Sequence, residues 1–433
     1  MSRVLGTLAA MALVGSAVGG CEGGEVIGAP GSPQGSRGAG DGLGPETYLG
    51  AGLEGDTDAA DTADPSVGAP GPRPEQGEGV PAGGWRLGTL VTDMAVAGDG
   101  RVWVAGAAVG GATEGTAGDL APWLMTAGGD GKGTWGVAAL GTDRMVVAGI
   151  RGGQVPHGWL GVYDLDGRED DAWQDTLDVG TSWLSRVATT AAGEVVAVGH
   201  RELRTGSGAW DLRRTALRVR WQPHGAADAR VDLLGSEHDG AWLNDVAVSE
   251  ELSMAVGGVR TADAPGTRQG WAVVGRQDGE STEWILGPGE LWGVSAQPDG
   301  SFVAVGETPQ GDASDVWLVC LDDQGRPTQT STLDLDGSDR AMDIVRSAAG
   351  TLLLAGSTER FSGNETQRAW VVEVALSDGG TPLLGGRRLG PAGATQSVGF
   401  TLVELPTGDL LTGGAGVFGD EQVRGWLLGP PKL

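Results

Sequence analysis

The stretch Phe302-Val303-Ala304-Val305-Gly306 decides the fold, because close variants of it recur along the chain. Earlier copies include Met145-Val146-Val147-Ala148-Gly149 and Val195-Val196-Ala197-Val198-Gly199. Seven copies close on a glycine, and neighbouring closing glycines lie 43 to 58 residues apart: Gly106, Gly149, Gly199, Gly257, Gly306, Gly356 and Gly413. A repeat of about fifty residues made of strands and turns is typical of a β-propeller.

Residues 291–336 show what one repeat contains. Four strands are expected in turn, at residues 291–296, 301–306, 316–321 and 328–335. The first two are joined by Gln297-Pro298-Asp299-Gly300, a tight turn in which Gly300 supplies a positive φ. The last strand alternates Thr, Ser, Leu and Asp and is expected to be more exposed. The predicted fold class is all-β: a seven-bladed β-propeller of four-stranded antiparallel blades.

The two ends of the repeat region complement each other. The last repeat supplies only three strands, at residues 400–403, 410–412 and 426–428. The segment Gly84-Trp85-Arg86-Leu87-Gly88 offers the fourth, so we expect this N-terminal strand to close the last blade and remove two exposed sheet edges. One repeat fits poorly. Only residues 131–134 separate the third strand of blade one from blade two, which leaves open whether blade one has its outer strand.

The repeat also carries a longer pattern. An Asp-Gly turn leads into Val-Ala-Gly, then a polar loop and Trp-Leu-x-x-x-Asp-x-x-Gly, most clearly in residues 99–106, 159–167 and 299–325. This pattern resembles the bacterial secreted and surface β-propeller lipoproteins with delta-sixty-type repeats. The resemblance covers about residues 85–429, with Leu217 in place of the tryptophan in blade three. It implies a fold and a surface location, and it names no ligand.

The N-terminus predicts how the chain is located. Residues 1–20 combine Arg3, an apolar run and small residues before Cys21, which is typical of a signal peptide. The junction Val18-Gly19-Gly20-Cys21 resembles a bacterial lipobox, which implies a lipoprotein signal peptide and acylation of Cys21. We expect a lipid anchor in the bilayer of the bacterial cell envelope, in the outer membrane. The other cysteine, Cys320, is expected to be a small buried hydrophobe.

The composition of the chain after the predicted signal peptide indicates two regions. Residues 21–82 are rich in Gly, Pro and acidic residues and have too little apolar surface to fold, so they predict a disordered acidic tether. Residues 83–433 form the predicted propeller. The net charge is −28, which disfavours nucleic acid as a partner. We expect a monomer.

The predicted binding surface is the face that carries the loops after the second strands, here called the long-loop face. These loops are expected at residues 107–122, 150–158, 200–216, 258–270, 307–315, 357–369 and 414–425. Variable loops on a rigid scaffold commonly bind ligands. The candidate ligand-binding residues are indoles at the beginnings of first strands and arginines of these loops: Trp135, Trp183, Trp242, Trp292, Arg213, Arg268, Arg368 and Arg424. Packing between blades and pairing with nearby acids are the alternative interpretations. The tryptophans that begin third strands are expected to be structural.

Several kinds of chemistry lack support. The four histidines show no metal-ligand spacing, so no metal site is expected. The paired acids around Asp166 and Asp336 lack the last acidic ligand of a calcium loop. No Gly-x-Ser-x-Gly elbow is present. We therefore expect no cofactor and assign no catalytic residue.

These observations favour a membrane-anchored surface lipoprotein whose propeller is a non-catalytic binding or scaffold module for an envelope protein or glycan. The alternative is a polysaccharide lyase or glycoside hydrolase with carboxylates at the channel mouth. Catalysis predicts acids that converge in a deep pocket beside arginines. A binding scaffold predicts a plugged channel and a shallow face of mixed character.

Overall fold

The computed structural model describes strands and turns of the repeat region only. All its described elements are β-strands, and no helix in this part of the chain is long and apolar enough to span a bilayer. The predicted signal peptide, Cys21 and the predicted tether lie outside the described residues. The described residues are 84–87, 90–98, 100, 102–106, 123–126, 132–151, 156–175, 180–204, 212–225, 229–250, 252–263, 266–276, 279–335, 337–359, 367–376, 382–391, 393–419 and 423–429.

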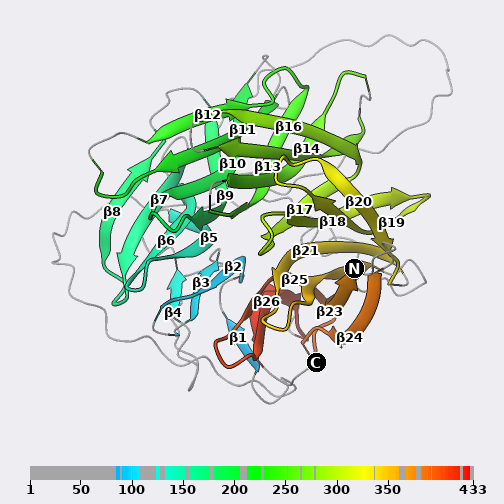
Figure 1. Cartoon of the computed structure of the whole chain (residues 1–433). Helices are drawn as coiled ribbons and strands as arrows, with labels where there is room; N and C mark the ends of the chain where they lie inside the picture. The colour runs from blue at the N-terminus through cyan, green and yellow to red at the C-terminus, as the bar shows by residue number, and fades with distance from the viewer. Residues whose placement is uncertain are drawn as a thin grey trace, which may run out of the picture. The chain divides into compact units, whose positions relative to one another are not determined.

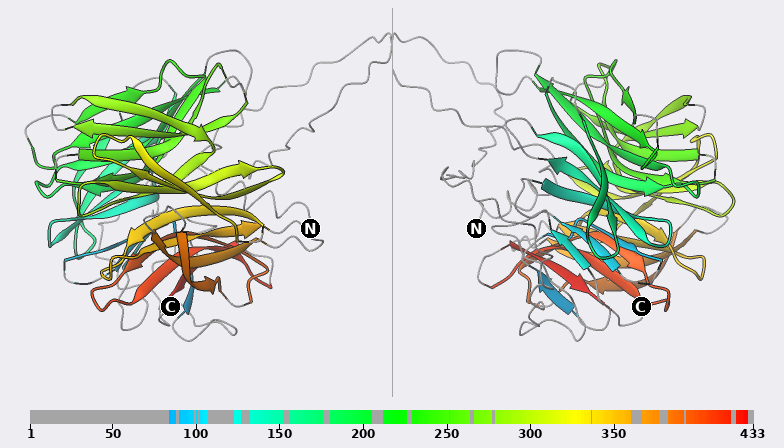
Figure 2. Two further views of the ribbon diagram at one scale, coloured as in Figure 1. Left: turned by 45° about the vertical axis from the view of Figure 1, so that its right-hand side comes forward. Right: turned by 90° about the vertical axis from the view of Figure 1, so that its left-hand side faces the viewer.

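Six four-stranded antiparallel sheets are arranged as the blades of a β-propeller (Figures 1 and 2). Two of them come from the first half of the repeat region: β5 (Lys132–Leu140), β6 (Arg144–Arg151), β7 (His157–Asp164) and β8 (Glu169–Gln174), then β9 (Thr181–Thr189), β10 (Val195–Arg204), β11 (Leu212–Trp221) and β12 (Arg230–Leu234). Two follow in the middle: β13 (Gly240–Val248), β14 (Leu252–Arg260), β15 (Arg268–Arg276) and β16 (Ser281–Pro288), then β17 (Glu290–Ala296), β18 (Phe302–Gln310), β19 (Ala313–Leu321) and β20 (Pro327–Leu333).

The last two blades complete the set. One consists of β21 (Ser338–Arg346), β22 (Leu352–Glu359), β23 (Arg368–Leu376) and β24 (Pro382–Leu389). The other joins β25 (Gln396–Glu404), β26 (Leu410–Val417) and β27 (Val423–Leu428) to β1 (Gly84–Leu87), in the order β1-β27-β26-β25. Gly84 pairs with Leu428 and Leu87 with Gly425, which confirms that the N-terminal strand closes the last blade.

The prediction of seven four-stranded antiparallel blades is wrong, because the first repeat does not form such a blade. Its described strands, β2 (Asp93–Val96), β3 (Val102–Gly106) and β4 (Trp123–Thr126), make a three-stranded sheet. In it β4 runs parallel to β3. A parallel pair needs a long crossover, and the sixteen residues between Gly106 and Trp123 are long enough to provide one. The short 131–134 connection also leaves no room for an outer strand. The protein is a propeller with six complete blades, and this smaller sheet contacts the blades on both sides of it through β5 and β25.

The recurring Val-Ala-Gly segments form the second strands, which are buried between sheets. Every residue of β22 before Glu359 is buried, whereas β8 is mostly exposed or half-buried, as expected for an outer strand. One core cluster joins Val146 and Leu160 of one blade to Leu184 and Val219 of the next. The described tryptophans of the third strands, including Trp159, Trp271 and Trp370, are almost fully buried, which confirms their structural role.

Several segments predicted as loops belong to strands. Residues 307–315 form the end of β18, a turn and the start of β19, with Glu307 opposite Val316 and Gln310 opposite Ala313. These polar residues extend the hairpin beyond the apolar core. They are polar because they are exposed, and they still pair with the neighbouring strand. The Gly300 turn is confirmed, with φ of 85°. Cys320 is half-buried, and burial raises the pKa of its thiol.

Candidate functional site

Equivalent positions on the innermost strands face the axis of the propeller. Six of these strands carry a β-bulge, and the residue after it is Gly136, Arg186, Asp245, Gly293, Asp343 or Thr401. On β2, Asp93 pairs with Ala105, the residue before Gly106, and so takes the same position. We call these seven residues the axial layer. Three aspartates and one arginine therefore meet in the centre of the molecule.

Each aspartate of the axial layer links two neighbouring sheets through backbone hydrogen bonds. Asp93 accepts from the Met94 N–H at 2.9 Å and, on the next sheet, from the Val137 N–H at 2.8 Å. Asp245 accepts from the N–H groups of Val246 (2.8 Å) and Val294 (2.7 Å) in the same way. Asp343 repeats the arrangement with Ile344 and Leu402, at 2.7 and 2.8 Å. The carboxylates hold adjacent sheets together.

Arg186 is the only cation of the axial layer. Its Nε lies 3.9 Å from Asp93 Oδ2 and 4.0 Å from Asp245 Oδ1, and its Nη1 donates to the Trp135 carbonyl at 2.9 Å. Its side chain is 16% exposed, and those of Asp93 and Asp245 are 13% and 12% exposed. The guanidinium thus stabilises two aspartates from different sheets.

Two glycines of the axial layer make this close approach possible. A Cβ on Gly136 would lie 2.8 Å from the Arg186 Cα, and one on Gly293 would lie 3.0 Å from the Asp343 Cα. Real Cβ atoms are rarely found this close to backbone. Glycine at these two of the seven positions lets neighbouring innermost strands pack closely there.

A cavity of about 310 Å³ reaches this layer. Its polar lining includes Asp93, Arg186, Asp245 and Asp343, and its walls include Val248, Ala296 and Val345. Val248 and Ala296 end first strands, so this cavity lies toward the tight turns that follow them, here called the short-turn face. The three aspartates of the axial layer therefore line a cavity on the side away from the long loops.

Burial sets the protonation of these acids. Burial raises the pKa of Asp93 to about 6 and that of Asp245 to about 7, although Arg186 and the backbone N–H groups act in the opposite direction. The pKa of Asp343 is also raised, chiefly by burial. The mutual repulsion of the aspartates adds to this effect. Such groups exchange protons near neutral pH, which is one requirement of a general acid or base.

Apolar side chains pack together at bulge positions on the long-loop side of the axial layer. Met342 and Phe400, at bulge positions, are 8% and 7% exposed and pack with Leu90 and Val398. Trp292 packs against the same cluster and is half-buried. A guanidinium, that of Arg340, lies 5.6 Å from the Trp292 ring. Apolar side chains thus lie on one side of the axial layer, and the cavity lies on the other.

The long-loop face carries a second charged network, centred on Glu290. This residue begins β17 and is 2% exposed. Its carboxylate accepts hydrogen bonds from Trp242 Nε1 at 2.7 Å, from Asn244 Nδ2 at 3.0 Å and from Arg268 Nη1 at 3.0 Å. Two of the candidate ligand-binding residues, Trp242 and Arg268, are therefore brought together by a buried acid.

Two further guanidiniums lie beside Trp242. The Cζ atoms of Arg214 and Arg260 are 6.0 and 5.8 Å from the centre of its ring. Arg214 comes from β11 of the preceding blade and forms an ion pair of 2.8 Å with Glu202, which is 4% exposed. Arg260 is the last residue of β14 and is exposed. Trp242 itself is 6% exposed, and its ring lies beneath the two guanidiniums.

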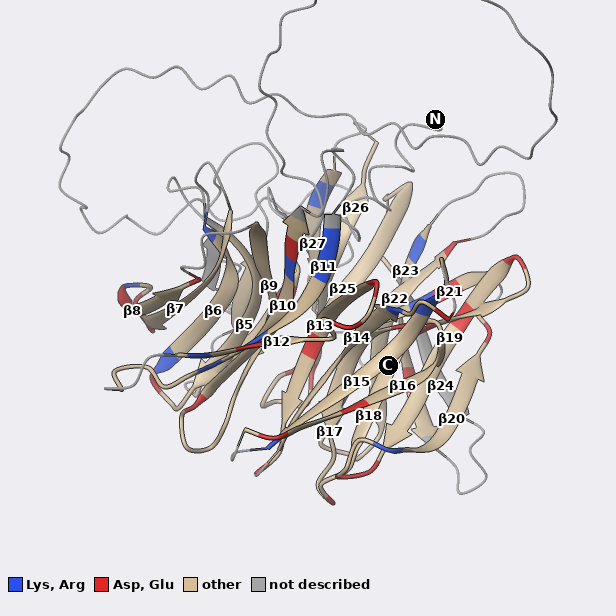
Figure 3. Ribbon diagram, turned by 90° about the horizontal axis from the view of Figure 1, so that it is seen from above, with Lys and Arg blue, Asp and Glu red and all other residues tan. Residues whose placement is uncertain are grey.

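The other candidates lie apart. Trp183 is buried and stacks on His200 at 4.8 Å between ring centres, while Trp135 is half-buried. Arg213 donates to the carbonyls of Ser236 and His238, and Arg368 donates to the Ala394 carbonyl at 3.0 Å (Figure 3 shows the basic starts of β11 and β23). Arg424 is half-buried in β27. Of the four candidate indoles, Trp183 and Trp242 are buried, and Trp135 and Trp292 are half-buried.

Sequence reasoning did not identify the axial layer as a site. A signal existed, because Asp93, Arg186, Asp245 and Asp343 each lie twelve or thirteen residues before the closing glycine of their repeat. Glu290 has no comparable signal, because its partners come from two other strands of a neighbouring blade.

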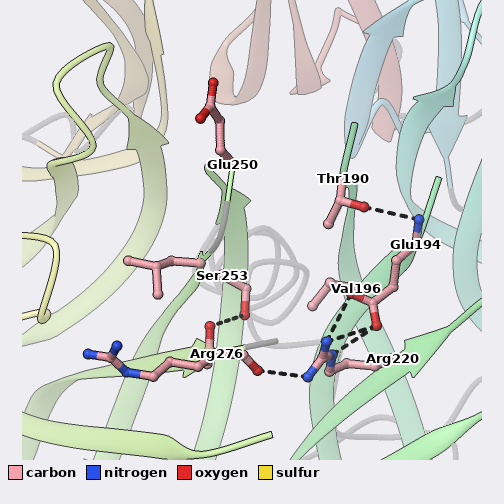
Figure 4. Close-up of a pocket in the computed structure, with 9 residues that line it drawn as sticks. Thr190, Glu194, Val196, Arg220, Glu250, Ser253 and Arg276 are labelled. Atoms are coloured by element: carbon pink, nitrogen blue, oxygen red, sulfur yellow. Dashed lines mark hydrogen bonds and ion pairs between the residues drawn. The ribbon is translucent and has the colours of Figure 1, made fainter. Parts of the chain in front are cut away.

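Two smaller features complete the described surface. A gap large enough for about one water molecule lies between β10–β11 and β14–β15, where Arg220 forms an ion pair with Glu194 and donates to the Arg276 carbonyl at 2.8 Å (Figure 4). Its charged groups are engaged between blades. Elsewhere Glu237, His238 and Glu283 place ligand atoms within 4.8 Å of one another, a grouping that the sequence spacing did not suggest.

No sequence-family model matches the chain, and no curated protein matches it. Among solved structures, a protein of unknown function from Dyadobacter fermentans DSM 18053 has a TM-score of 0.48 at 12% identity, covering 70% of this chain and 96% of that one. The periplasmic gluconolactonase of Pseudomonas aeruginosa has a TM-score of 0.44 at 14% identity, covering 78% and 94%. The β-propeller fold of this chain is established by its own sheet order. Likeness at this level gives no activity.

Proposed function

We propose that this protein is a lipid-anchored surface lipoprotein of the bacterial cell envelope and that its propeller is a non-catalytic binding module. The observation that supports the module best is the Glu290 network, where Arg214, Arg260 and Arg268 gather on the long-loop face of a chain with net charge −28. A concentration of guanidiniums on an acidic protein suits the recognition of an envelope component with acidic groups. The apolar packing of Met342 and Phe400 on this side agrees with a surface that binds without enclosing its ligand.

Binding is tested with the full-length chain and a panel of envelope and extracellular polysaccharides, together with cross-linking in intact cells for a protein partner. Arg368→Glu and Arg424→Glu change the charge of the long-loop face, and Arg346→Glu, at the end of β21, changes that of the short-turn face. We expect the first two variants to lose the captured partner and the third to keep it. Equal capture by all three variants contradicts a long-loop binding face.

Anchoring rests on the lipobox-like junction before Cys21. Two acyl chains on this cysteine would give stable membrane attachment without any spanning segment. Cys21→Ser is expected to move the protein from the membrane fraction to the soluble fraction, and Cys320→Ser serves as the matched control. Unchanged fractionation of Cys21→Ser contradicts the lipoprotein proposal and leaves the binding proposal intact.

A second candidate function is supported by one specific observation, the axial cavity. Asp93 and Asp245 have pKa values raised to about 6 and 7 beside Arg186, as a polysaccharide lyase or glycoside hydrolase would need for proton transfer. Against it, both oxygens of each carboxylate already accept backbone hydrogen bonds, one from the carboxylate's own strand and one from the next sheet. Cleavage of polysaccharides by the full-length chain, measured as new reducing ends and lost in Asp245→Asn, would favour the enzyme over the binding module.

A further inference from the structure

We propose that the long-loop face holds an oxyanion site, formed by Arg260 with Arg214 and Arg268 above Trp242, which binds the carboxylate or sulfate group of an acidic glycan. The inference rests on the proposed binding function and specifies its ligand. It is carried by strand register, by pairing and by the charge balance around one indole.

The strand register places two arginines opposite each other. In the β14–β15 pair, Arg260 lies directly across from Arg268. Like charges in directly opposed positions destabilise a sheet. Arg268 is neutralised by Glu290 at 3.0 Å. The Arg260 guanidinium, in contrast, has no ion pair or hydrogen bond with any residue that the structure describes, although the Arg260 backbone is paired in the sheet. A local rule of sheet stability is broken at this one exposed position, as is common at binding sites.

A third guanidinium converges from the neighbouring blade. Arg214 of β11 and Arg260 of β14 both lie within 6.0 Å of the centre of the Trp242 ring, so two blades direct cations to one spot. Each cation gains from the face of the indole. Glu202 and Glu290 hold Arg214 and Arg268 in place, and both acids are almost fully buried. The frame of the site is rigid, and Arg260 is the member left available to a ligand.

Among the residues that the structure describes, the charge balance of this group leaves one positive charge without a counterion. Three arginines face two carboxylates, Glu202 and Glu290, in this group. Partial burial and the neighbouring Arg268 and Arg214 lower the pKa of Arg260, so the guanidinium lies in an environment that disfavours its charge. One bound oxyanion would neutralise the surplus and make charge-assisted hydrogen bonds to the arginines.

The polar character of the face favours a glycan over a protein as the carrier of the anion. Protein interfaces contain a buried apolar centre. Among the described residues, the exposed large apolar side chains are Leu233 and Ile285, which belong to the outer strands β12 and β16. The neighbourhood of Arg260 provides guanidiniums and buried acids instead. A uronic acid or a sulfated sugar has the matching chemistry.

The test is isothermal titration of the full-length chain with sodium sulfate, trigalacturonate and a neutral trisaccharide. Arg260→Gln removes the surplus charge, and Arg346→Gln removes an exposed arginine on the short-turn face as the matched control. We expect sulfate and trigalacturonate to bind the parent chain and Arg346→Gln, and affinity to fall about ten- to a hundredfold in Arg260→Gln. Added sodium chloride is expected to weaken both.

Different outcomes identify different failures. Equal affinity in Arg260→Gln, or no binding of either anion, overturns the oxyanion site. If the neutral trisaccharide binds as tightly as trigalacturonate, the oxyanion site is wrong and the binding function survives. Tighter binding of a poly-glutamate peptide than of trigalacturonate overturns the glycan assignment. Finally, thermal unfolding without ligand distinguishes a structural role of Arg260 from a ligand-binding role. A structural role predicts a lower melting temperature for Arg260→Gln, whereas a ligand-binding role predicts no decrease.

Discussion

The axial layer and the Arg260 group lie a few residues apart along the same strands, yet they treat charge in opposite ways. In β13, Asp245 accepts backbone N–H groups from two sheets, while Trp242 lies beneath guanidiniums from two blades. The axial layer has three acids and one arginine, all engaged within the protein. The Arg260 group has one more arginine than it has carboxylates. Charge that is used internally builds the propeller, and charge left over on a rigid frame is available to a ligand.

The largest expected effect comes from removing the cation of the axial layer. Arg186→Met leaves Asp93 and Asp245 without a counterion, and breaking a buried ion pair in this way costs about 4 kcal/mol of unfolding free energy. Chemical denaturation at pH 8, where these acids are ionised, measures the loss. Arg346→Met is the control and should change stability by less than about 0.5 kcal/mol. Similar losses in the two variants would remove the distinction between the axial layer and an ordinary surface.

The second effect is the pH dependence of stability. The folded pKa values of Asp93 and Asp245, about 6 and 7, exceed the ordinary value of 3.8, so between pH 4 and 7 the folded state binds more protons than the unfolded state. Unfolding free energy contributed by these groups is therefore complete below pH 4 and is lost as the pH rises to 7, by about 3 kcal/mol for the shift of Asp93 alone. Denaturation midpoints across this range measure the decline. Asp245→Asn should make it shallower, and an unchanged slope in that variant would contradict the assignment.

A third, smaller effect concerns packing around the axis. Gly136→Ala places a Cβ 2.8 Å from the Arg186 Cα, so two innermost strands must move apart at a cost of about 2 kcal/mol. Gly240→Ala is matched to it, because nothing lies within 4 Å of the added Cβ and Gly240 has no positive φ. Thermal unfolding of the two variants should separate them clearly. Equal melting temperatures would show that the strands are free to adjust.

The smallest effect is expected on the long-loop face. Arg260→Gln removes one member of the opposed Arg260–Arg268 pair, and unfolding free energy should stay constant or rise by up to about 0.5 kcal/mol. Guanidinium chloride would screen this term, so urea denaturation at low salt is the suitable measurement. A loss of more than 1 kcal/mol, on the order of a lost buried hydrogen bond, would show that Arg260 supports the fold as the axial residues do.

The sequence predicted those parts of the fold that are encoded within one repeat or at its ends. The closing glycines located the second strands, and the three-stranded C-terminal repeat led correctly to the closure by β1. The predicted number of seven four-stranded antiparallel blades is wrong. Trp123–Thr126 pairs with β3 in the parallel direction, and the composition of the repeat does not specify the direction of this strand. Polar residues such as Glu307 and Gln310 were taken for loops because hairpin ends that lack an apolar neighbour have the composition of loops.

The candidate site was harder to predict because its contacts join different repeats. Trp242 and Arg268 were selected separately, and the acid that unites them, Glu290, comes from the next blade. Asp93 and Asp245 were passed over because each is a single acid in an apolar strand. Only the circular arrangement brings Arg186 between them. Contacts between side chains of different repeats cannot be predicted by examining each repeat separately.

The pairing of β1 with β27 also has a consequence for how the protein reaches its native state. Gly84 and Leu428 are neighbours in one blade, although almost the whole propeller separates them along the chain. Contacts between such distant segments slow folding, because a very large loop must close before the contact stabilises anything. The edges of β27 and β1 are therefore expected to stay open longest after synthesis or export. During that interval a chain is most exposed to pairing with the wrong strand, including one from another copy of itself.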